Sequence, residues 1–385
     1  MNSFSKVGCL VLITVSLTAC GTLTGLGTDN TPPPSPLVAY SPELTPTTLW
    51  SATPGTGTND MVIKLVPVLV NNAVITADQS GVVAATNAAN GHVIWQTPLN
   101  TPLTAGPNTN GAIVVVGTSQ GELYALQLSN GHVLWHSVLP NQILGVPQIS
   151  ANSVVVETVD GKLLTLNANT GQIQWSYEHG APTMILRGGS SPQITRNEVI
   201  AGYADGKVAA YSLADGRLIW EHMLSEPSGA TDIEQMVDVV ADPIVADGVI
   251  YAVNYQGNIS ALDVGTGNVI WEHGMSSYTG MALNNQFLFV TDANGYVWAF
   301  DRNSGDVLWR QTQLANRIIS APVIQGNTVV VADGEGFVHW LSQQDGRFVA
   351  RISTASAPIS VAPAVNGNTI YVLNNSGVLT AYVVR

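Results

Sequence analysis

The sequence has few cysteines and few charged residues, and each shortage excludes a class of protein. It contains only two cysteines, Cys9 and Cys20, which are too few for the disulfide frameworks of small secreted domains. Charged residues make up 10% of the chain, against about 25% in an average domain. The formal net charge of −13 argues against nucleic acid and anionic lipid surfaces as partners, because both are bound by basic patches.

The sequence also lacks an apolar run long enough to span a bilayer. The apolar segment Val7–Leu17 is too short for that and follows one basic residue, Lys6, as in a secretory signal peptide. The next residues, Thr18-Ala19-Cys20, complete a sequence that resembles the lipobox of bacterial lipoproteins. That resemblance implies cleavage before Cys20 and acylation of its thiol. An ordinary secretory signal with a chance cysteine is the alternative.

The organisation expected from this start has three parts. Residues 1–19 form the signal peptide, and residues 20–46, which are rich in Thr, Gly and Pro, form a lipid-anchored tether. Residues 47–385 form one domain. Gly21 stands where lipoproteins retained at the inner membrane often carry aspartate, which favours the outer membrane.

A glycine followed by an alternating apolar strand recurs eight times, at intervals of about 40 residues. Within each copy, apolar segments are separated by two turns suited to tight hairpins, such as Asp160-Gly161 and Asn90-Gly91. Four short antiparallel strands per repeat make one propeller blade. The sequence therefore predicts an all-β, eight-bladed β-propeller of four-stranded antiparallel blades. The eight copies begin at Gly81, Gly121, Gly161, Gly206, Gly257, Gly295, Gly336 and Gly377.

The chain also indicates how the blades pack and how the ring closes. In six copies a tryptophan follows the second turn, and its regular place predicts packing between blades rather than a ligand platform. The eighth copy ends at Arg385 without a fourth strand, whereas an unassigned strand ending at Trp50 precedes the first copy. We expect that N-terminal strand to complete the last blade and to remove an exposed sheet edge. The six tryptophans are Trp95, Trp135, Trp175, Trp220, Trp271 and Trp309.

No motif in the chain predicts a catalytic residue, a metal site or a cofactor. Gly117–Gly121 matches G-x-S-x-G but falls in a hairpin turn, whereas a nucleophile elbow requires strand–turn–helix. His132 and His136 are four residues apart on a turn and a strand rather than a helix, which does not favour zinc. Acids such as Asp232 and Asp242 follow no calcium-loop pattern.

Departures from the repeat are better indicators of specificity. The connections Trp175–Pro192 and Trp220–Pro243 are longer than others such as Trp95–Pro107. Equivalent connections emerge on one face of a propeller, and insertions on one face often form its binding surface. These two neighbouring insertions are therefore expected to form one contiguous patch.

The content of the two insertions supports a protein-binding role. The first contains Met184, Ile185, Leu186 and Arg187, and the second is acidic, with Asp238 among its residues. Methionine and arginine are enriched in interface cores. Two alternatives stay open: Ile185 and Leu186 pack inward as core, or Arg187 forms an ion pair within the chain.

The lipobox, the eight repeats and the two insertions together resemble the BamB family, the lipoprotein subunits of the machine that inserts β-barrel proteins into the outer membrane. The resemblance implies a non-catalytic scaffold on the periplasmic face, which binds BamA through its third POTRA domain and presents sheet edges or a face to unfolded barrel proteins. It places partner contacts at Met184, Leu186, Arg187 and Asp238. Val240 departs from the aspartate that the family has there. Family-like stretches are Leu186–Gly188, Ala261–Asp263, Gly267–Trp271 and Asp345–Ala350.

Two further function hypotheses stand beside this one. The stretch Ala261–Trp271 resembles the A-x-D-x-x-T-G-x-x-x-W repeat of quinoprotein alcohol dehydrogenases, eight-bladed enzymes that use pyrroloquinoline quinone with calcium. Those enzymes hold an adjacent-cysteine disulfide beside the quinone, and this chain has no such pair. A generic ligand-binding propeller of the cell envelope is the other alternative.

Overall fold

The computed structural model describes residues 32–354 and 357–385. Residues Pro34–Arg385 form one compact unit, and every named strand belongs to it. Cys20 and the expected signal peptide lie outside the described residues. All named elements of the described residues are β-strands, and none of these residues form a helix long and apolar enough to cross a membrane.

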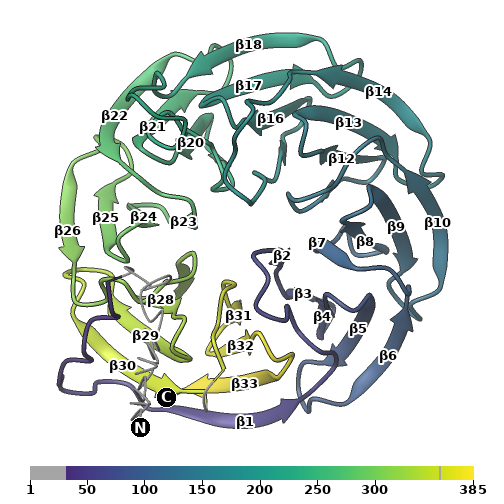
Figure 1. Ribbon diagram of the computed structural model, residues 1–385. Coiled ribbons are helices and arrows are strands. Elements are labelled where there is room, and N and C mark those ends of the chain that lie inside the picture. The colour runs from purple at the N-terminus through teal and green to yellow at the C-terminus, as the bar shows by residue number, and fades with distance from the viewer. Residues whose placement is uncertain (1–31, 355–356) are drawn as a thin grey trace, which may run out of the picture. The chain divides into compact units, whose positions relative to one another are not determined.

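The strands of unit Pro34–Arg385 form eight sheets in a ring, which confirms the predicted eight-bladed propeller (Figure 1). Blade 1 consists of β3 (Val68–Val70), β4 (Ala73–Ala77), β5 (Val82–Asn87) and β6 (Val93–Pro98). Blade 2 consists of β7 (Leu103–Thr109), β8 (Ile113–Thr118), β9 (Glu122–Gln127) and β10 (Val133–Val138). Blade 3 consists of β11 (Gln148–Ile149), β12 (Ser153–Glu157), β13 (Lys162–Asn167) and β14 (Ile173–Glu178). Blade 4 consists of β15 (Gln193–Ile194), β16 (Glu198–Gly202), β17 (Lys207–Ser212) and β18 (Leu218–Met223).

The second half of the ring repeats the same order. Blade 5 consists of β19 (Ile244–Ala246), β20 (Val249–Val253), β21 (Gly257–Asp263) and β22 (Val269–Met275). Blade 6 consists of β23 (Gly280–Leu283), β24 (Phe287–Thr291), β25 (Val297–Asp301) and β26 (Val307–Gln311). Blade 7 consists of β27 (Val323–Gln325), β28 (Thr328–Ala332), β29 (Phe337–Ser342) and β30 (Phe348–Ser353). Blade 8 consists of β31 (Ala364–Asn366), β32 (Thr369–Leu373), β33 (Leu379–Val384) and the N-terminal β1 (Pro46–Ala52).

The ring closes as the sequence predicts. Strand β1 pairs antiparallel with β33, with Pro46 opposite Val384 and Ala52 opposite Leu379. One unpredicted strand, β2 (Lys64–Leu65), adds to blade 2 by pairing parallel with β7. The candidate elbow residue Ser119 lies in the turn between β8 and β9, so the segment has strand–turn–strand geometry.

The tryptophans pack between blades, as expected. The indole Nε1 of Trp135 donates to the Ala168 carbonyl of the next blade at 2.8 Å. A Cβ added to Gly171 of that blade would lie 2.6 Å from the indole ring, so the turn must carry glycine. Trp50 of β1 makes the same contacts with blade 1, where it donates to the Ala88 carbonyl and faces Gly91. The closing strand therefore continues the packing pattern of the ring.

Residues 34–45, which the sequence assigns to the tether, lie against the outside of blade 7. We call this segment the strap. The purple stretch that leads into β1 in Figure 1 follows the blade of β27–β30. Arg317 donates to the Ser35 carbonyl at 2.9 Å and Arg351 donates to the Val38 carbonyl at 3.0 Å. The strap thus belongs to the folded body of the protein.

Candidate interaction site

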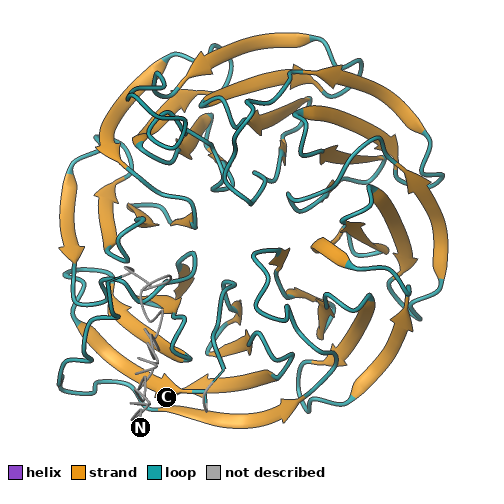
Figure 2. Cartoon of the chain, viewed as in Figure 1, coloured by secondary structure: helices purple, strands orange, loops and turns teal. Residues whose placement is uncertain are grey.

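Two long connections form the candidate site. Loop 179–192 joins β14 to β15, and loop 224–243 joins β18 to β19. Both run from the outermost strand of one blade to the innermost strand of the next, and alternating strand directions place all connections of this kind on one face. Figure 2 shows long teal loops at this part of the ring, beside the inner strands of blades 3 to 5. The structure brings the two loops into contact, as the sequence predicts.

The structure distributes the predicted contact residues of the first loop between surface and interior. The side chain of Met184 is 43% exposed, and Arg187 is exposed. Within the described residues, the Arg187 side chain makes no hydrogen bond or ion pair. The ion pair within the chain that was one alternative for Arg187 is therefore not formed there. Ile185 and Leu186 are half-buried. The loop therefore exposes the thioether of Met184 and the guanidinium of Arg187, whereas Ile185 and Leu186 are only partly accessible.

Asp238 of the second loop lies beneath the first loop rather than on the surface. Its side chain is 2% exposed, and its Oδ1 accepts a hydrogen bond from the Leu186 N–H at 2.8 Å. Burial raises the pKa of Asp238 to about 6, although the Leu186 N–H and its own N–H act in the opposite direction. In this structure Asp238 holds the backbone at Leu186, next to Arg187, and does not face solvent.

A second carboxylate, Asp242, fixes the other end of the first loop. Its Oδ1 accepts a hydrogen bond from the Ser191 N–H at 2.6 Å and from Lys64 Nζ at 2.7 Å. Lys64 also donates to the Val240 carbonyl at 2.8 Å. Lys64 belongs to the short strand β2, which is distant in sequence, so no local pattern could have identified it as part of the site.

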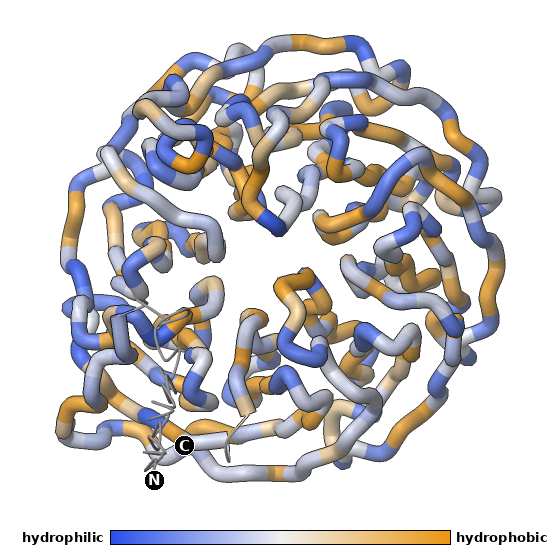
Figure 3. The backbone as a smooth tube through the Cα atoms, viewed as in Figure 1, coloured by the Kyte–Doolittle hydropathy of each residue, from blue (hydrophilic) through white to orange (hydrophobic). Residues whose placement is uncertain are grey.

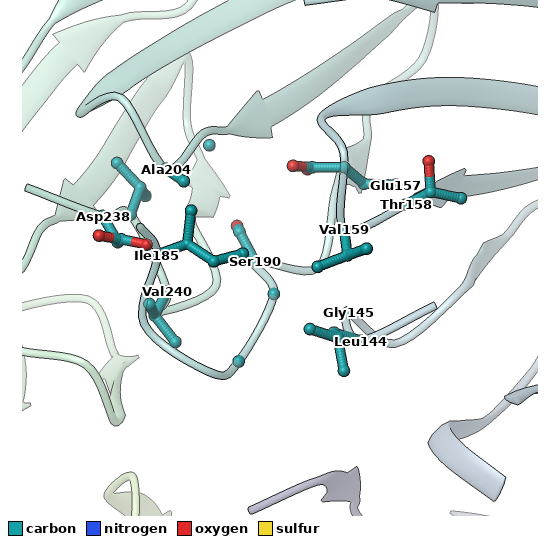
Figure 4. Close-up of a pocket in the computed structure, with 14 residues that line it drawn as sticks. Leu144, Gly145, Glu157, Thr158, Val159, Ile185, Ser190, Ala204, Asp238 and Val240 are labelled. Atoms are coloured by element: carbon teal, nitrogen blue, oxygen red, sulfur yellow. The ribbon is translucent and has the colours of Figure 1, made fainter. Parts of the chain in front are cut away.

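A small cavity lies between the two loops and β12 (Figure 4). It measures about 30 Å³, and Ile185 and Val240 contribute apolar walls. Glu157 Oε2, Ser190 Oγ and Asp238 Oδ2 are buried at this site with no hydrogen-bond partner in the described protein. Burial raises the pKa of Glu157 well above its usual range, although Lys64 acts in the opposite direction. Cavities with this size and polarity accommodate water.

Val240 fills the position where the family resemblance leads us to expect an aspartate. Its side chain is buried and lines the cavity together with Ile185. A Cβ added to Gly188 would lie 2.9 Å from Val240 Cγ1, which shows how closely the two loops pack. Here apolar packing and the hydrogen bonds of Asp238 and Asp242 to the first loop join the two loops, while Lys64 ties the Val240 carbonyl of the second loop to β2.

The described residues hold no group of three or more His, Cys, Asp or Glu side chains arranged to bind a metal ion. The site exposes Met184 and Arg187 on a loop whose backbone is held by the carboxyl groups of Asp238 and Asp242. Such a surface suits recognition of a protein partner, since methionine and arginine, its exposed residues, are enriched at protein interfaces.

Comparison with known proteins identifies the family. The family model described as outer membrane protein assembly factor BamB matches residues 79–311 and 302–385. A Legionella pneumophila protein named outer membrane protein assembly factor BamB is 41% identical over 331 residues, which cover 85% of this chain and 86% of that protein. The crystal structure of BamB from Moraxella catarrhalis superposes with a TM-score of 0.80 at 27% identity, covering 88% of this chain and 100% of that one.

Quinoprotein enzymes share the architecture only. The quinohemoprotein alcohol dehydrogenase from Comamonas testosteroni superposes with a TM-score of 0.69 at 14% identity, covering 88% of this chain and 76% of the enzyme. At that identity the likeness concerns the propeller fold alone. The family match and the curated relative together cover most of the propeller, including both loops of the candidate site. The chain therefore belongs to the BamB family of outer membrane protein assembly factors.

Proposed function

We propose that this protein is a non-catalytic scaffold of the outer membrane β-barrel assembly machinery and that it binds the periplasmic POTRA region of BamA. The observation that carries the proposal is the exposure of Met184 and Arg187 on a loop whose backbone is held by the buried carboxyl of Asp238. In this proposal Arg187 docks on an acidic site of BamA, while Met184 and Leu186 enter an apolar pocket. A rigid, preformed loop loses little conformational entropy on binding, which favours affinity.

The proposal includes attachment to the periplasmic face of the outer membrane through an acylated Cys20. Attachment would keep the scaffold near its partner and raise its effective concentration there. Mass spectrometry of the N-terminal peptide tests this part, with Cys20→Ser as the control. An unmodified cysteine in the membrane fraction would contradict it.

Calorimetry of the full chain in detergent against the POTRA region of its own BamA tests the binding site. We expect saturable binding that Arg187→Ala weakens by about 2 kcal/mol or more, as for a central interface arginine. Arg196→Ala serves as the matched control, because Arg196 is also exposed among described residues but lies in the turn between β15 and β16. Circular dichroism checks that both variants keep the fold. Binding that is insensitive to Arg187 would place the interface elsewhere.

A further inference from the structure

The second long loop contains a compact segment, residues 225–237, whose two ends are clamped together. The side chain of Asn254, directly after β20, donates from Nδ2 to Ser225 Oγ at 2.5 Å and to the Val237 carbonyl at 3.0 Å. Val237 is also buried. Both ends of the segment are therefore held by one amide group, as in the compact surface loops called Ω-loops, which are frequently functional.

The tip of this segment is held in one conformation by its own side chains. Glu234 Oε2 accepts hydrogen bonds from the N–H groups of Ala230 and Thr231 at 2.8 and 3.1 Å. In return, the Glu234 N–H donates to Thr231 Oγ1 at 3.3 Å, which completes a capping box. Gln256 Nε2 donates to the Ile233 carbonyl at 2.9 Å, yet the Ile233 side chain is 61% exposed. The turn thus presents a large apolar side chain to solvent from a fixed backbone.

Two tyrosines lie beside this tip. The rings of Tyr255 and Tyr278 meet edge to face with 6.3 Å between their centroids, and Tyr278 is 36% exposed. Gln256, whose side chain binds the Ile233 carbonyl, follows Tyr255 directly, and its N–H donates to Ser276 Oγ at 3.0 Å. These contacts join Ile233 and Tyr278 into one surface. Tyrosine is enriched at protein interfaces.

The surroundings of Ile233 are acidic. Glu226, Asp232 and Glu234 are exposed, and none of them forms an ion pair with a basic side chain of the described residues. Figure 3 shows hydrophilic and hydrophobic residues side by side in the loops at this part of the ring. The first loop, in contrast, exposes the cationic Arg187. The two loops therefore present opposite charges.

Asp238 connects this surface to the first loop. Its carboxylate accepts the Leu186 N–H, and its backbone carbonyl accepts the Tyr255 N–H at 2.9 Å. Each side of a stable protein interface contributes about 20–30 residues, which is more than loop 179–192 contains. A partner bound at Arg187 must therefore also cover neighbouring elements, and the surface around Ile233 is continuous with that loop.

We propose that Glu226, Asp232, Ile233 and Tyr278 form a second half of the partner interface, which docks a segment of the same partner with basic side chains on either side of an apolar one. Ile233 and Tyr278 make the apolar contact, and the two acids face the basic side chains. The opposite charges of the two halves fix the orientation of the partner, because a reversed partner would bring like charges together. The identity of the partner, the POTRA region of BamA, rests on the proposed function, whereas the chemistry of the surface rests on the contacts above.

Binding of the POTRA region to the full chain in detergent, measured by biolayer interferometry, tests the apolar contact. We expect Ile233→Ala to raise the Kd about fivefold or more, as for a residue that contributes to an interface core. Val62→Ala is the matched control, because Val62 is 64% exposed in the connection between β1 and β3, across the ring from blade 5 (Figure 1). Circular dichroism checks the fold of both variants. An unchanged Kd for Ile233→Ala would overturn the proposal.

Asp232→Lys tests the charge of the docked segment. We expect slower association and a weaker dependence on salt, because exposed interface charges act mainly on the association rate. Glu335→Lys makes the same change in net charge at an exposed residue of the turn between β28 and β29, and should leave the rate unchanged. Equal slowing by both variants would reveal an effect of net charge alone and count against the acidic surface.

The outcome is separable from that of the proposed function. Binding that is weakened by Arg187→Ala but not by Ile233→Ala would overturn the second half and keep the loop site. Binding that is weakened by Ile233→Ala but not by Arg187→Ala would support the second half and overturn the role of Arg187. A POTRA region that does not bind the unmodified chain would overturn both, because the occupant would then be wrong.

Discussion

The carboxylate of Asp238 accepts a hydrogen bond from the backbone N–H of Leu186 across 52 residues of sequence. This bond joins two insertions of neighbouring blades into one unit. Asp238 therefore has a structural role in the candidate interface, because its side chain faces the loop backbone and not the solvent. The bond thereby holds the backbone one residue before Arg187.

The buried carboxyl of Asp238 should make stability depend on pH. Its pKa is about 6 in the folded protein against 3.8 without the fold, so the folded state binds the proton more tightly. The contribution of Asp238 to the free energy of unfolding is therefore highest below about pH 4, falls as the pH rises to about 6, and is constant above. We expect Asp238→Asn, which keeps an acceptor for Leu186 but has no charge, to lose this fall. Urea unfolding of both proteins across this range measures it, and a difference independent of pH would contradict it.

Lys64 should slow amide hydrogen exchange in the first loop. Its Nζ binds Asp242, which in turn accepts the Ser191 N–H. We expect Lys64→Gln to raise amide hydrogen exchange at Ser191 about fivefold, equivalent to about 1 kcal/mol for a partly exposed pair. Lys162→Gln is the matched control, because Lys162 faces an exposed Glu178 at 3.7 Å. Equal exchange at Ser191 in both variants would show that Lys64 does not hold the loop.

Glycine at the inter-blade turn should be required for steric reasons. Gly171 has φ of +71° and an added Cβ would lie 2.6 Å from both Trp135 and Ser137, while Gly111 has φ of +89° with open space around it. Gly111→Ala should lose about 1–2 kcal/mol from the left-handed backbone alone. Gly171→Ala should lose a further 1–3 kcal/mol, roughly, from overpacking. Urea unfolding compares the two, and equal losses would refute the packing role of the tryptophan.

Among the acidic residues of blade 7, Asp333 should be the one whose substitution lowers the stability of the protein most. It is buried and accepts hydrogen bonds from Arg317 at 2.6 Å and from His339 at 2.8 Å, and those partners hold its pKa below its usual range although burial acts to raise it. Asp333→Asn leaves the buried Arg317 without a counter-charge and should cost about 3 kcal/mol or more.

The control for Asp333 is Asp292→Asn, at the corresponding turn of blade 6. Asp292 accepts hydrogen bonds from two backbone N–H groups and the indole of Trp298, and no arginine of the described residues binds it, so Asp292→Asn should lower stability by about 1 kcal/mol. Thermal unfolding measured by circular dichroism distinguishes the two. A loss at Asp292 as large as that at Asp333 would show that the backbone contacts, and not the ion pair, dominate.

The propeller could be predicted because its causes repeat along the chain. Glycine turns, alternating strands and a tryptophan at a regular place recur in successive blades, and each repeat contacts mainly its neighbours. The closing strand β1 was predictable for the same reason, since the eighth repeat lacks one strand and Trp50 matches the repeat. The strap was not predictable, because its proline-rich composition resembles a flexible linker and its partners, Arg317 and Arg351, are 282 and 313 residues away.

By itself, the sequence determined the all-β class, the eight blades, the closure of the ring and the choice of two insertions as the candidate site. These follow from periodicity and from local turn chemistry, which act between residues close in sequence. Only the tertiary structure decided that Asp238 is a buried brace, that Lys64 binds the second loop, and that the strap packs against blade 7. Those outcomes depend on which distant groups become neighbours when the ring closes, and burial then sets the charge and hydrogen bonding of each.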